Sequence, residues 1–248
     1  KKEGLFTLYY DAKKHLVSAE IKPGQLDKIY LLQSSLSQGL GEFGLYRGMP
    51  LDDLTVTLHR VENTLQVTVP NSLFRSTPGD VTNGRENEFF SDSVVLTLPI
   101  TSVQEGSGNL LVDLDPLFTS ASPVFQDLAN WVGFLGYTAG DNFLKTVQAF
   151  PLNLEFDTNY QFTGGSSDML LTPMTVPNPT AFGLGVHYSL SEIVPNPNFR
   201  PRPADERAGY FITTYWDLSK RRDRNPFVRY IDRWDLEKQD PKATLSPP

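Results

Sequence analysis

Apolar and polar residues alternate along most of the chain, which is the pattern of β-strands with one buried face. Residues 54–59 alternate leucine or valine with threonine or histidine, and residues 65–69 resume the alternation after a short polar break. These two runs predict an antiparallel hairpin that turns at Glu62 and Asn63. Two more hairpins are expected from the paired runs 6–10 with 16–21 and 93–100 with 109–114, and further strands from 153–163, 181–192, 209–218 and 227–237.

One segment has helical spacing instead. Ser122 can cap a helix, and Pro123 suits its first position because no hydrogen-bond donor is needed there. Gly133 and Gly136 limit its length. A second short helix is expected over residues 141–149, ending before a proline. The apolar residues at helical intervals in the first segment are Val124, Leu128, Trp131, Val132 and Leu135.

Turn residues are frequent, with 19 prolines and 18 glycines. Consecutive hairpins argue against parallel βαβ units. The sequence therefore predicts a mainly β fold of antiparallel, hairpin-rich sheets, sandwich-like or α+β, with one or two short helices. We expect a single β-rich domain over residues 1–240, or a further boundary near 120–150, and residues 241–248 as the start of a linker.

Composition narrows the class of protein. The 248 residues are 39% apolar and 21% charged, as in a globular protein. The longest apolar stretch, residues 128–137, is too short to span a bilayer, so no transmembrane segment is expected. The chain begins without an apolar targeting segment, and we expect it to be a piece of a longer protein. The absence of cysteine excludes disulfides, thiolate metal sites and a cysteine nucleophile.

Charge is unevenly distributed. The formal net charge is −7, although residues 200–242 contain 11 Lys/Arg and 8 Asp/Glu. An acidic chain of this kind is a poor nucleic-acid binder, so no nucleic-acid partner is expected. The basic segment suits contact with an acidic protein surface.

Motifs for catalysis are weak. Residues 39–44 match G-x-G-x-x-G, but Gly48 and Pro50 follow at once, so the match predicts a glycine-rich loop and not a dinucleotide site. The histidines, His15, His59 and His187, are far apart in the sequence, and none lies in H-E-x-x-H. We expect the first in a turn and the others on sheet faces.

Paired carboxylates also fail to indicate a catalytic site. Asp113 and Asp115 are expected on one strand, and Asp52 and Asp53 are adjacent, whereas glycosidases need two carboxylates that converge across the substrate. No serine lies in G-x-S-x-G. No catalytic or metal-binding residue is therefore assigned, and a self-contained hydrolase using Asp and Glu is the weakest hypothesis.

Residues 200–234 interleave arginines with aromatic residues. The pattern predicts a hairpin with its tip at 220–224, and its second strand carries Arg229 and Arg233 on one face and Tyr230 and Trp234 on the other. Arginine and aromatic side chains are also those that protein interfaces favour. A protein contact is thus the second interpretation, and single-stranded nucleic acid the third.

Three stretches resemble a known family. They are LYRGMPLDDL at 45–54, RPADERAGYF at 202–211, which is similar to an "ADxRxGYF" element, and RYIDRWDLEK at 229–238. In this order they resemble the N-terminal, non-catalytic region of the large bacterial zinc-dependent metallopeptidases, which precedes a metzincin-like catalytic domain.

The resemblance implies that the peptidase machinery lies beyond Pro248. The extended H-E-x-x-H motif of that family has no counterpart here, so no cofactor is expected in this chain, and zinc is expected in the catalytic domain. The implied partner is this downstream domain, and the implied location is periplasmic or extracellular. We expect the contact zone at Asp205, Arg207, Tyr210 and the strand Arg229–Arg233.

Alternatives remain at this point. Asp205 and Arg207 can instead form a local ion pair, or a carboxylate such as Asp205 can block the zinc ion of a latent peptidase. The chain can also be a stand-alone β-type carbohydrate- or peptide-binding module, because it contains ten tyrosines and three tryptophans. That hypothesis requires exposed aromatic rings, and Trp131, Trp216 and Trp234 are the residues that test it.

Overall fold

The computed structural model describes residues 1–120, 126–165, 168–207, 209–220 and 225–236, together with Asp240, Lys242 and Thr244. The chain divides into two compact units. Unit 1 contains residues 1–70 and 93–193, and unit 2 contains residues 71–92 and 194–248. Both units therefore combine segments that are distant in the sequence.

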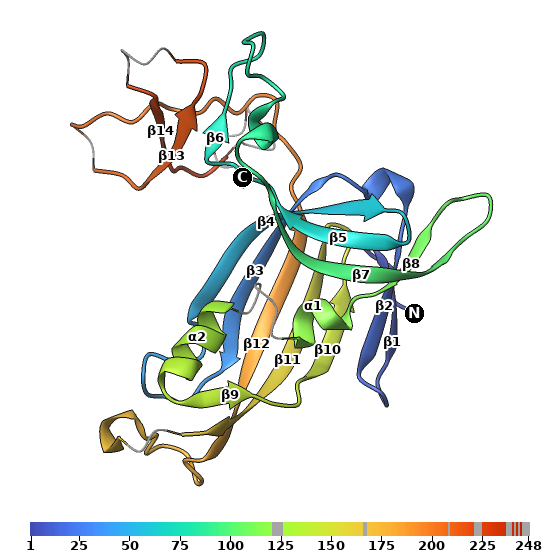
Figure 1. The fold of residues 1–248 in the computed structure, drawn as a ribbon, viewed down its shortest axis with the longest axis vertical. Helices are drawn as coiled ribbons and strands as arrows, with labels where there is room; N and C mark the ends of the chain where they lie inside the picture. The colour runs from blue at the N-terminus through green and yellow to red at the C-terminus, as the bar shows by residue number, and fades with distance from the viewer. Residues whose placement is uncertain are drawn as a thin grey trace. The chain divides into compact units, whose positions relative to one another are not determined.

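Unit 1 is built on one large sheet (Figure 1). The strand order is β1-β2-β8-β7-β5-β4-β3-β12-β11-β10, with β9 also paired to β11, and every pairing is antiparallel. The strands are β1 (Thr7–Asp11), β2 (Leu16–Ile21), β3 (Ile29–Gln38), β4 (Pro50–Val61), β5 (Thr64–Val69), β7 (Ser93–Val103), β8 (Leu110–Asp113), β9 (Tyr137–Ala139), β10 (Phe143–Ala149), β11 (Asn153–Gly164) and β12 (Ala181–Glu192).

The sheet is curled, and its two edge strands approach each other (Figure 1). The backbone N–H of Leu5 donates to the carbonyl of Phe150 at 2.6 Å. The hydroxyl of Tyr10 donates to the carbonyl of Leu144 at 3.2 Å, and Nδ1 of His15 lies 2.8 Å from the same oxygen. Side chains at every second position of β11 and β12 point into the curl and are buried. The alternating sequence pattern thus becomes one enclosed core.

Two helices lie against the inner face of this sheet (Figure 1). They are α1 (Asp115–Thr119) and α2 (Gln126–Phe134), and unit 1 also has the 3-10 turns η1 (Pro23–Gln25) and η4 (Met169–Leu171). Phe118 of α1 stacks on Phe156 with ring centroids 3.9 Å apart. The hydroxyl of Tyr160 donates to the carbonyl of Phe118 and lies 2.7 Å from the hydroxyl of Tyr188. The buried phenols therefore fix α1 inside the core.

Unit 2 has a smaller sheet of strands β14-β13-β6. The strands are β6 (Phe74–Arg75), β13 (Ile212–Asp217) and β14 (Phe227–Ile231), and a 3-10 turn η2 spans Glu86–Glu88. β13 and β14 are antiparallel, whereas β13 and β6 are parallel. Phe74 stacks on Phe90 at 3.7 Å between ring centroids, and Trp216 lies 6.2 Å from Phe74.

The structure confirms the predicted fold class and the three hairpins β1–β2, β4–β5 and β7–β8. The glycine-rich segment 39–44 is a loop, as expected. The hairpin of β13 and β14 is also confirmed, although residues 221–224 of its tip lie outside the described residues. The helix around residues 124–135 is present as α2, and its predicted cap Ser122 and predicted first residue Pro123 lie outside the described residues.

Three predictions were wrong, and one strand was missed. Residues 143–149 form strand β10 and not a helix, because they pair with β11 and bury Leu144 and Val147. Asp115 begins α1, so it does not share a strand with Asp113. β13 begins only at Ile212 and β14 ends at Ile231, so residues 209–211 and 232–236 lie outside the strands. Strand β3 was not predicted, although its buried pattern has period two.

The predicted division at residue 240 is not tested by the two units and stays a prediction. Residues 126–150, where a further boundary was considered, lie in unit 1. No helix in the described ranges is long and apolar enough to cross a membrane.

Candidate functional site

Unit 2 presents most of its large apolar side chains to solvent. Among its described residues, Ile231 is the one apolar side chain that is buried. Exposed aromatic clusters of this kind mark surfaces that bind other molecules. The exposed large apolar residues of unit 2 are Leu73, Val81, Phe89, Val194, Tyr210, Phe211, Ile212, Trp216, Phe227, Trp234 and Leu236.

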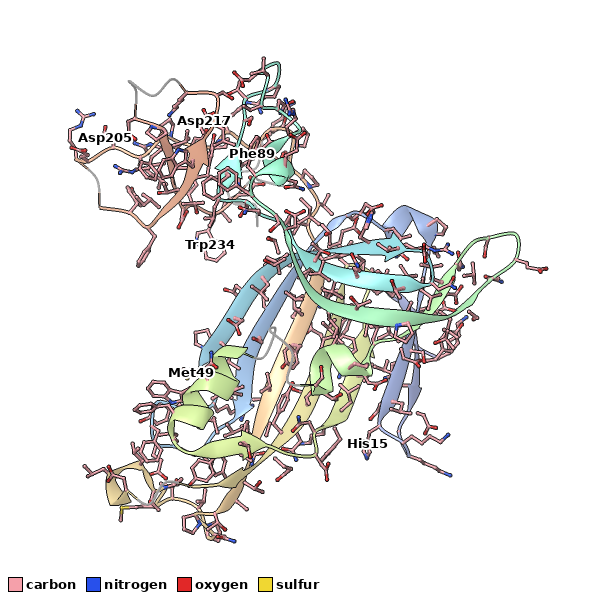
Figure 2. The ribbon with its side chains drawn as sticks, viewed as in Figure 1. His15, Met49, Phe89, Asp205, Asp217 and Trp234 are labelled. Atoms are coloured by element: carbon pink, nitrogen blue, oxygen red, sulfur yellow. The ribbon has the colours of Figure 1, made fainter. Side chains whose placement is uncertain are left out.

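Four of the residues next to β13 and β14 form a pocket of about 420 Å³, lined by Phe211, Asp232, Arg233 and Trp234. We call it the aromatic pocket. The backbone N–H of Asp232 donates to the carbonyl of Phe211 at 2.9 Å, which holds the two segments together. Phe211 and Trp234 are 89% and 83% exposed, and the ring of Trp234 projects from the segment after β14 (Figure 2). The backbone of the aromatic pocket is therefore held by a hydrogen bond, and its two aromatic rings are exposed to solvent.

Polar contacts position the charged members of the aromatic pocket. The hydroxyl of Thr213 donates to Oδ1 of Asp232 at 2.7 Å. The guanidinium of Arg233 lies 4.6 Å from the ring centroid of Phe199, and its Nη2 donates to the carbonyl of Arg200 at 2.5 Å. Stacking on a ring orients an arginine without neutralising it. Arg233 thus presents a positive charge beside two exposed aromatic rings.

Asp205 (Figure 2) and Arg207 form an ion pair on an exposed loop. Nε and Nη2 of Arg207 donate to the two carboxylate oxygens at 2.9 and 2.5 Å. The hydrogen bond from this guanidinium, followed by that from the backbone N–H of Arg207, lowers the pKa of Asp205 to about 2. This geometry is that of the local ion pair considered from the sequence. The blocking of a zinc ion by Asp205 is not tested by this geometry and stays a prediction.

The other predicted contact residues lie around the same sheet. Tyr210 is 57% exposed and precedes Phe211. The guanidinium of Arg229 lies 5.9 Å from the ring centroid of Phe227. The backbone carbonyl of Arg229 accepts a hydrogen bond from the backbone N–H of Ala204 at 2.9 Å. The segment that leads to Asp205 therefore runs beside β14. The structure places these residues in one unit, and their contact with a partner stays a prediction.

Phe211, Asp232 and Trp234 were not included in the predicted contact zone. The extrapolated strand pattern put Trp234 on the same face as Tyr230, but the strand ends three residues earlier. The arginine and aromatic interleaving did point to this segment. None of the three tryptophans is buried, since Trp131, Trp216 and Trp234 are 47%, 41% and 83% exposed.

Acidic and histidine side chains do not gather into a metal centre within the described part of the chain. His15 lies in the turn between β1 and β2, His59 lies on β4 with Nδ1 2.6 Å from Oδ1 of Asp27, and His187 lies on β12. His187 has the most connected site, with Nδ1 2.9 Å from Oδ1 of Asp157 and Nε2 2.7 Å from Oε2 of Glu155. The three histidines thus occupy separate places, as predicted.

The described residues of unit 2 join exposed aromatic rings to an oriented arginine, which is the composition of a protein-binding surface. No curated protein and no solved structure matches the chain. Residues 48–239 match a family of protein domains described as Domain of unknown function (DUF5117), which covers parts of both units. The chain belongs to this family.

Proposed function

We propose that this chain is a non-catalytic accessory region of a zinc-dependent metallopeptidase and that unit 2 docks on the peptidase domain. The observation that carries the proposal is the exposure of Phe211 and Trp234 beside the oriented Arg233. Exposed aromatic rings cost free energy in water, and burial against a partner recovers it. The nature of the partner rests on the three stretches that resemble the metallopeptidase family.

The charge of the surface indicates what the partner offers. Unit 2 contains 13 Lys/Arg and 12 Asp/Glu, whereas unit 1 contains 9 Lys/Arg and 17 Asp/Glu. A partner surface that is apolar at its centre and acidic at its rim complements Phe211, Trp234 and Arg233. Docking of this kind orients or restrains the peptidase domain without supplying a catalytic group. The same role needs no zinc ligand from this chain, and it is compatible with an exported protein.

The test compares this chain with the full-length protein. Hydrogen exchange at residues 210–212 and 232–236 is expected to be slower in the full-length protein than in this chain alone, because docking covers the aromatic pocket. Metal analysis and a peptidase assay on the full-length protein test the second part of the proposal. A full-length protein without zinc and without peptidase activity contradicts the nature of the partner.

A pair of variants tests the surface itself. The double variant Phe211→Ala and Trp234→Ala is expected to remove the protection and to change the peptidase activity of the full-length protein. Phe134→Ala is the control, since Phe134 is an exposed aromatic residue of unit 1. If the double variant and the control both behave as wild type, unit 2 does not dock through the aromatic pocket.

A further inference from the structure

We propose that unit 1 binds an acidic oligosaccharide in a groove on the outer face of its sheet. A hollow of about 390 Å³ lies over β12 and its neighbours, and we call it the polar groove. Its lining includes Ser37, Arg47, Lys145, Asp157 and Asn159. The inference concerns a different unit from the proposed docking surface and does not rest on it.

One glycine, Gly185 of β12, is among the residues that line the polar groove. The outward-facing positions of β12 are 183, 185, 187, 189 and 191, and the first two are glycines. Gly185 pairs with Asn159 of β11 on one side and with Gln38 of β3 on the other. A Cβ atom at position 185 would lie 2.6 Å from Oγ of Ser37, so a side chain does not fit there. Gly185 is itself buried, and the hydroxyl of Ser37 occupies the space that its side chain would need, so a polar group of β3 lies over the middle of the sheet.

The strand register places lining residues of the polar groove from β10, β11, β12 and β3 in one row across the sheet. Phe143 of β10 pairs with Asn159, which pairs with Gly185, which pairs with Gln38. The loop after β3 returns to the same row, because the N–H of Gly48 donates to the carbonyl of Leu36 at 2.7 Å and so brings Arg47 next to it. Amide, hydroxyl and carboxylate groups that converge in this way suit the hydroxyl groups of a sugar. The partly exposed ring of Phe143, fixed 5.1 Å from the ring of His15, offers an apolar face for the sugar ring.

The groove brings together two of the nine Lys/Arg residues of unit 1, Arg47 and Lys145. Lys145 is the single Lys or Arg between residues 93 and 193. Neither Lys145 nor Arg47 is within 4.0 Å of a carboxylate oxygen in the described ion pairs. The carboxylate of Asp157 is already held, at 2.9 Å by Nδ1 of His187 and at 2.6 Å by the hydroxyl of Thr146. Two cations that form none of the described ion pairs favour a ligand with a carboxylate or sulfate group.

Other polymers fit less well. β3, β12 and β11 are paired on both sides, so no free strand edge is available for an added peptide strand. The 9 Lys/Arg and 17 Asp/Glu of unit 1 repel a nucleic acid, whose binding depends on many phosphate contacts. A short saccharide with one or a few acidic groups needs only the local pair of cations.

Titration calorimetry on this chain tests the inference with four probes. They are a galacturonic acid hexasaccharide, the same compound as its methyl ester, a heparin hexasaccharide and maltohexaose. Binding of the galacturonic acid or the heparin probe, with no binding of the methyl ester or maltohexaose, is the expected result. The two acidic probes distinguish a carboxylate from a sulfate as the recognised group. Absence of binding to both at millimolar concentration overturns the proposal, as does equal binding of the neutral probes.

Variants locate the site. Arg47→Gln and Lys145→Gln are each expected to weaken binding roughly tenfold, the loss expected for one charge-assisted hydrogen bond. Arg60→Gln is the matched control, because Arg60 is an exposed arginine near the far end of β4 from the groove. Melting temperatures of all variants establish that they are folded. Binding that is unchanged in both groove variants places the ligand elsewhere and contradicts the proposal.

Discussion

The two units are stabilised by different interactions. Unit 1 contains the whole buried core of the described chain, apart from Ile231. Unit 2 is held by stacked rings, such as Phe74 on Phe90, by the guanidinium of Arg75 4.7 Å from the ring of Tyr215, and by short strand pairings. A curled sheet can enclose apolar side chains, whereas a three-stranded sheet has too few residues to cover its own.

The difference separates two kinds of surface. The described outer face of unit 1 is polar around β11 and β12, and its interior is apolar, so the unit needs no partner to hide its core. Unit 2 leaves rings such as Phe211 and Trp234 exposed. We therefore expect substitutions of the same kind to affect stability in unit 1 and binding in unit 2.

The largest effect is expected from Phe156→Ala. Phe156 is fully buried and stacks on Phe118, so its truncation removes apolar contacts and leaves a cavity. The free energy of unfolding should fall by about 3–5 kcal/mol. The same substitution at Phe211 should change it by less than about 0.5 kcal/mol, because that ring is exposed. Urea denaturation of both variants checks the comparison, and similar losses at the two positions would contradict it.

A smaller effect is expected at the buried pair of phenols. Tyr160 donates to the carbonyl of Phe118, so the hydroxyl of Tyr188 is the donor in the bond between the two. Tyr160→Phe leaves the carbonyl of Phe118 without the phenol donor and should lower the free energy of unfolding by about 1–3 kcal/mol. Tyr188→Phe should lower it by about 1 kcal/mol. Burial raises the pKa of both phenols, so this ranking should hold at any pH below 9. Denaturation curves that reverse the order would show that Tyr188 has the more important hydroxyl.

The next effect depends on pH. Burial alone would lower the pKa of His187, but the hydrogen bonds and negative charges of Asp157 and Glu155 outweigh burial and raise it above 6.5. The folded state thus binds the proton more tightly than the unfolded state. The stabilisation is complete below pH 6.5 and is lost as the pH rises through the raised pKa. His187 is partly exposed, so we expect the free energy of unfolding of the wild type to exceed that of His187→Gln by no more than about 1 kcal/mol at pH 5.5. The difference should be smaller at pH 9. A difference that grows with pH would contradict this assignment.

The smallest effect on stability is expected at the ion pair of unit 2. Asp205 and Arg207 lie on an exposed loop, where solvent screens their attraction. Arg207→Glu should leave the unfolding midpoint of this chain unchanged. In the full-length protein the same variant tests the predicted contact zone. Wild-type peptidase activity and stability there would remove Asp205 and Arg207 from the zone and leave the aromatic pocket as the docking surface.

Local patterns predicted the hairpins because strand pairing between neighbours needs only a turn and matching alternation. The turn at Glu62 and Asn63 follows this logic, and Glu62 has the positive φ of 52° that a tight turn requires. Residues 143–149 show where the logic fails. Their spacing suits a helix, but the partner strand β11 and the buried positions of Leu144 and Val147 decide for a strand.

The candidate sites were predicted only in part. The segment with Tyr210, Arg229 and Arg233 stood out by composition. The exposure of Phe211 and Trp234 depends on where β13 begins and β14 ends, which periodicity does not determine. The polar groove had no sequence signal, because Arg47, Lys145 and Gly185 meet only through the register of four strands.

The amino-acid sequence alone determined that the chain is a mainly β protein without cysteine chemistry, with an acidic body and a segment rich in arginine and aromatic residues. These properties follow from local periodicity and composition, which act residue by residue. The tertiary structure decided that two interleaved units form, that one encloses the core, and that the rings of the other stay exposed. The physical reason is that burial and strand register are set by segments distant in the sequence, and no local pattern encodes which of them meet.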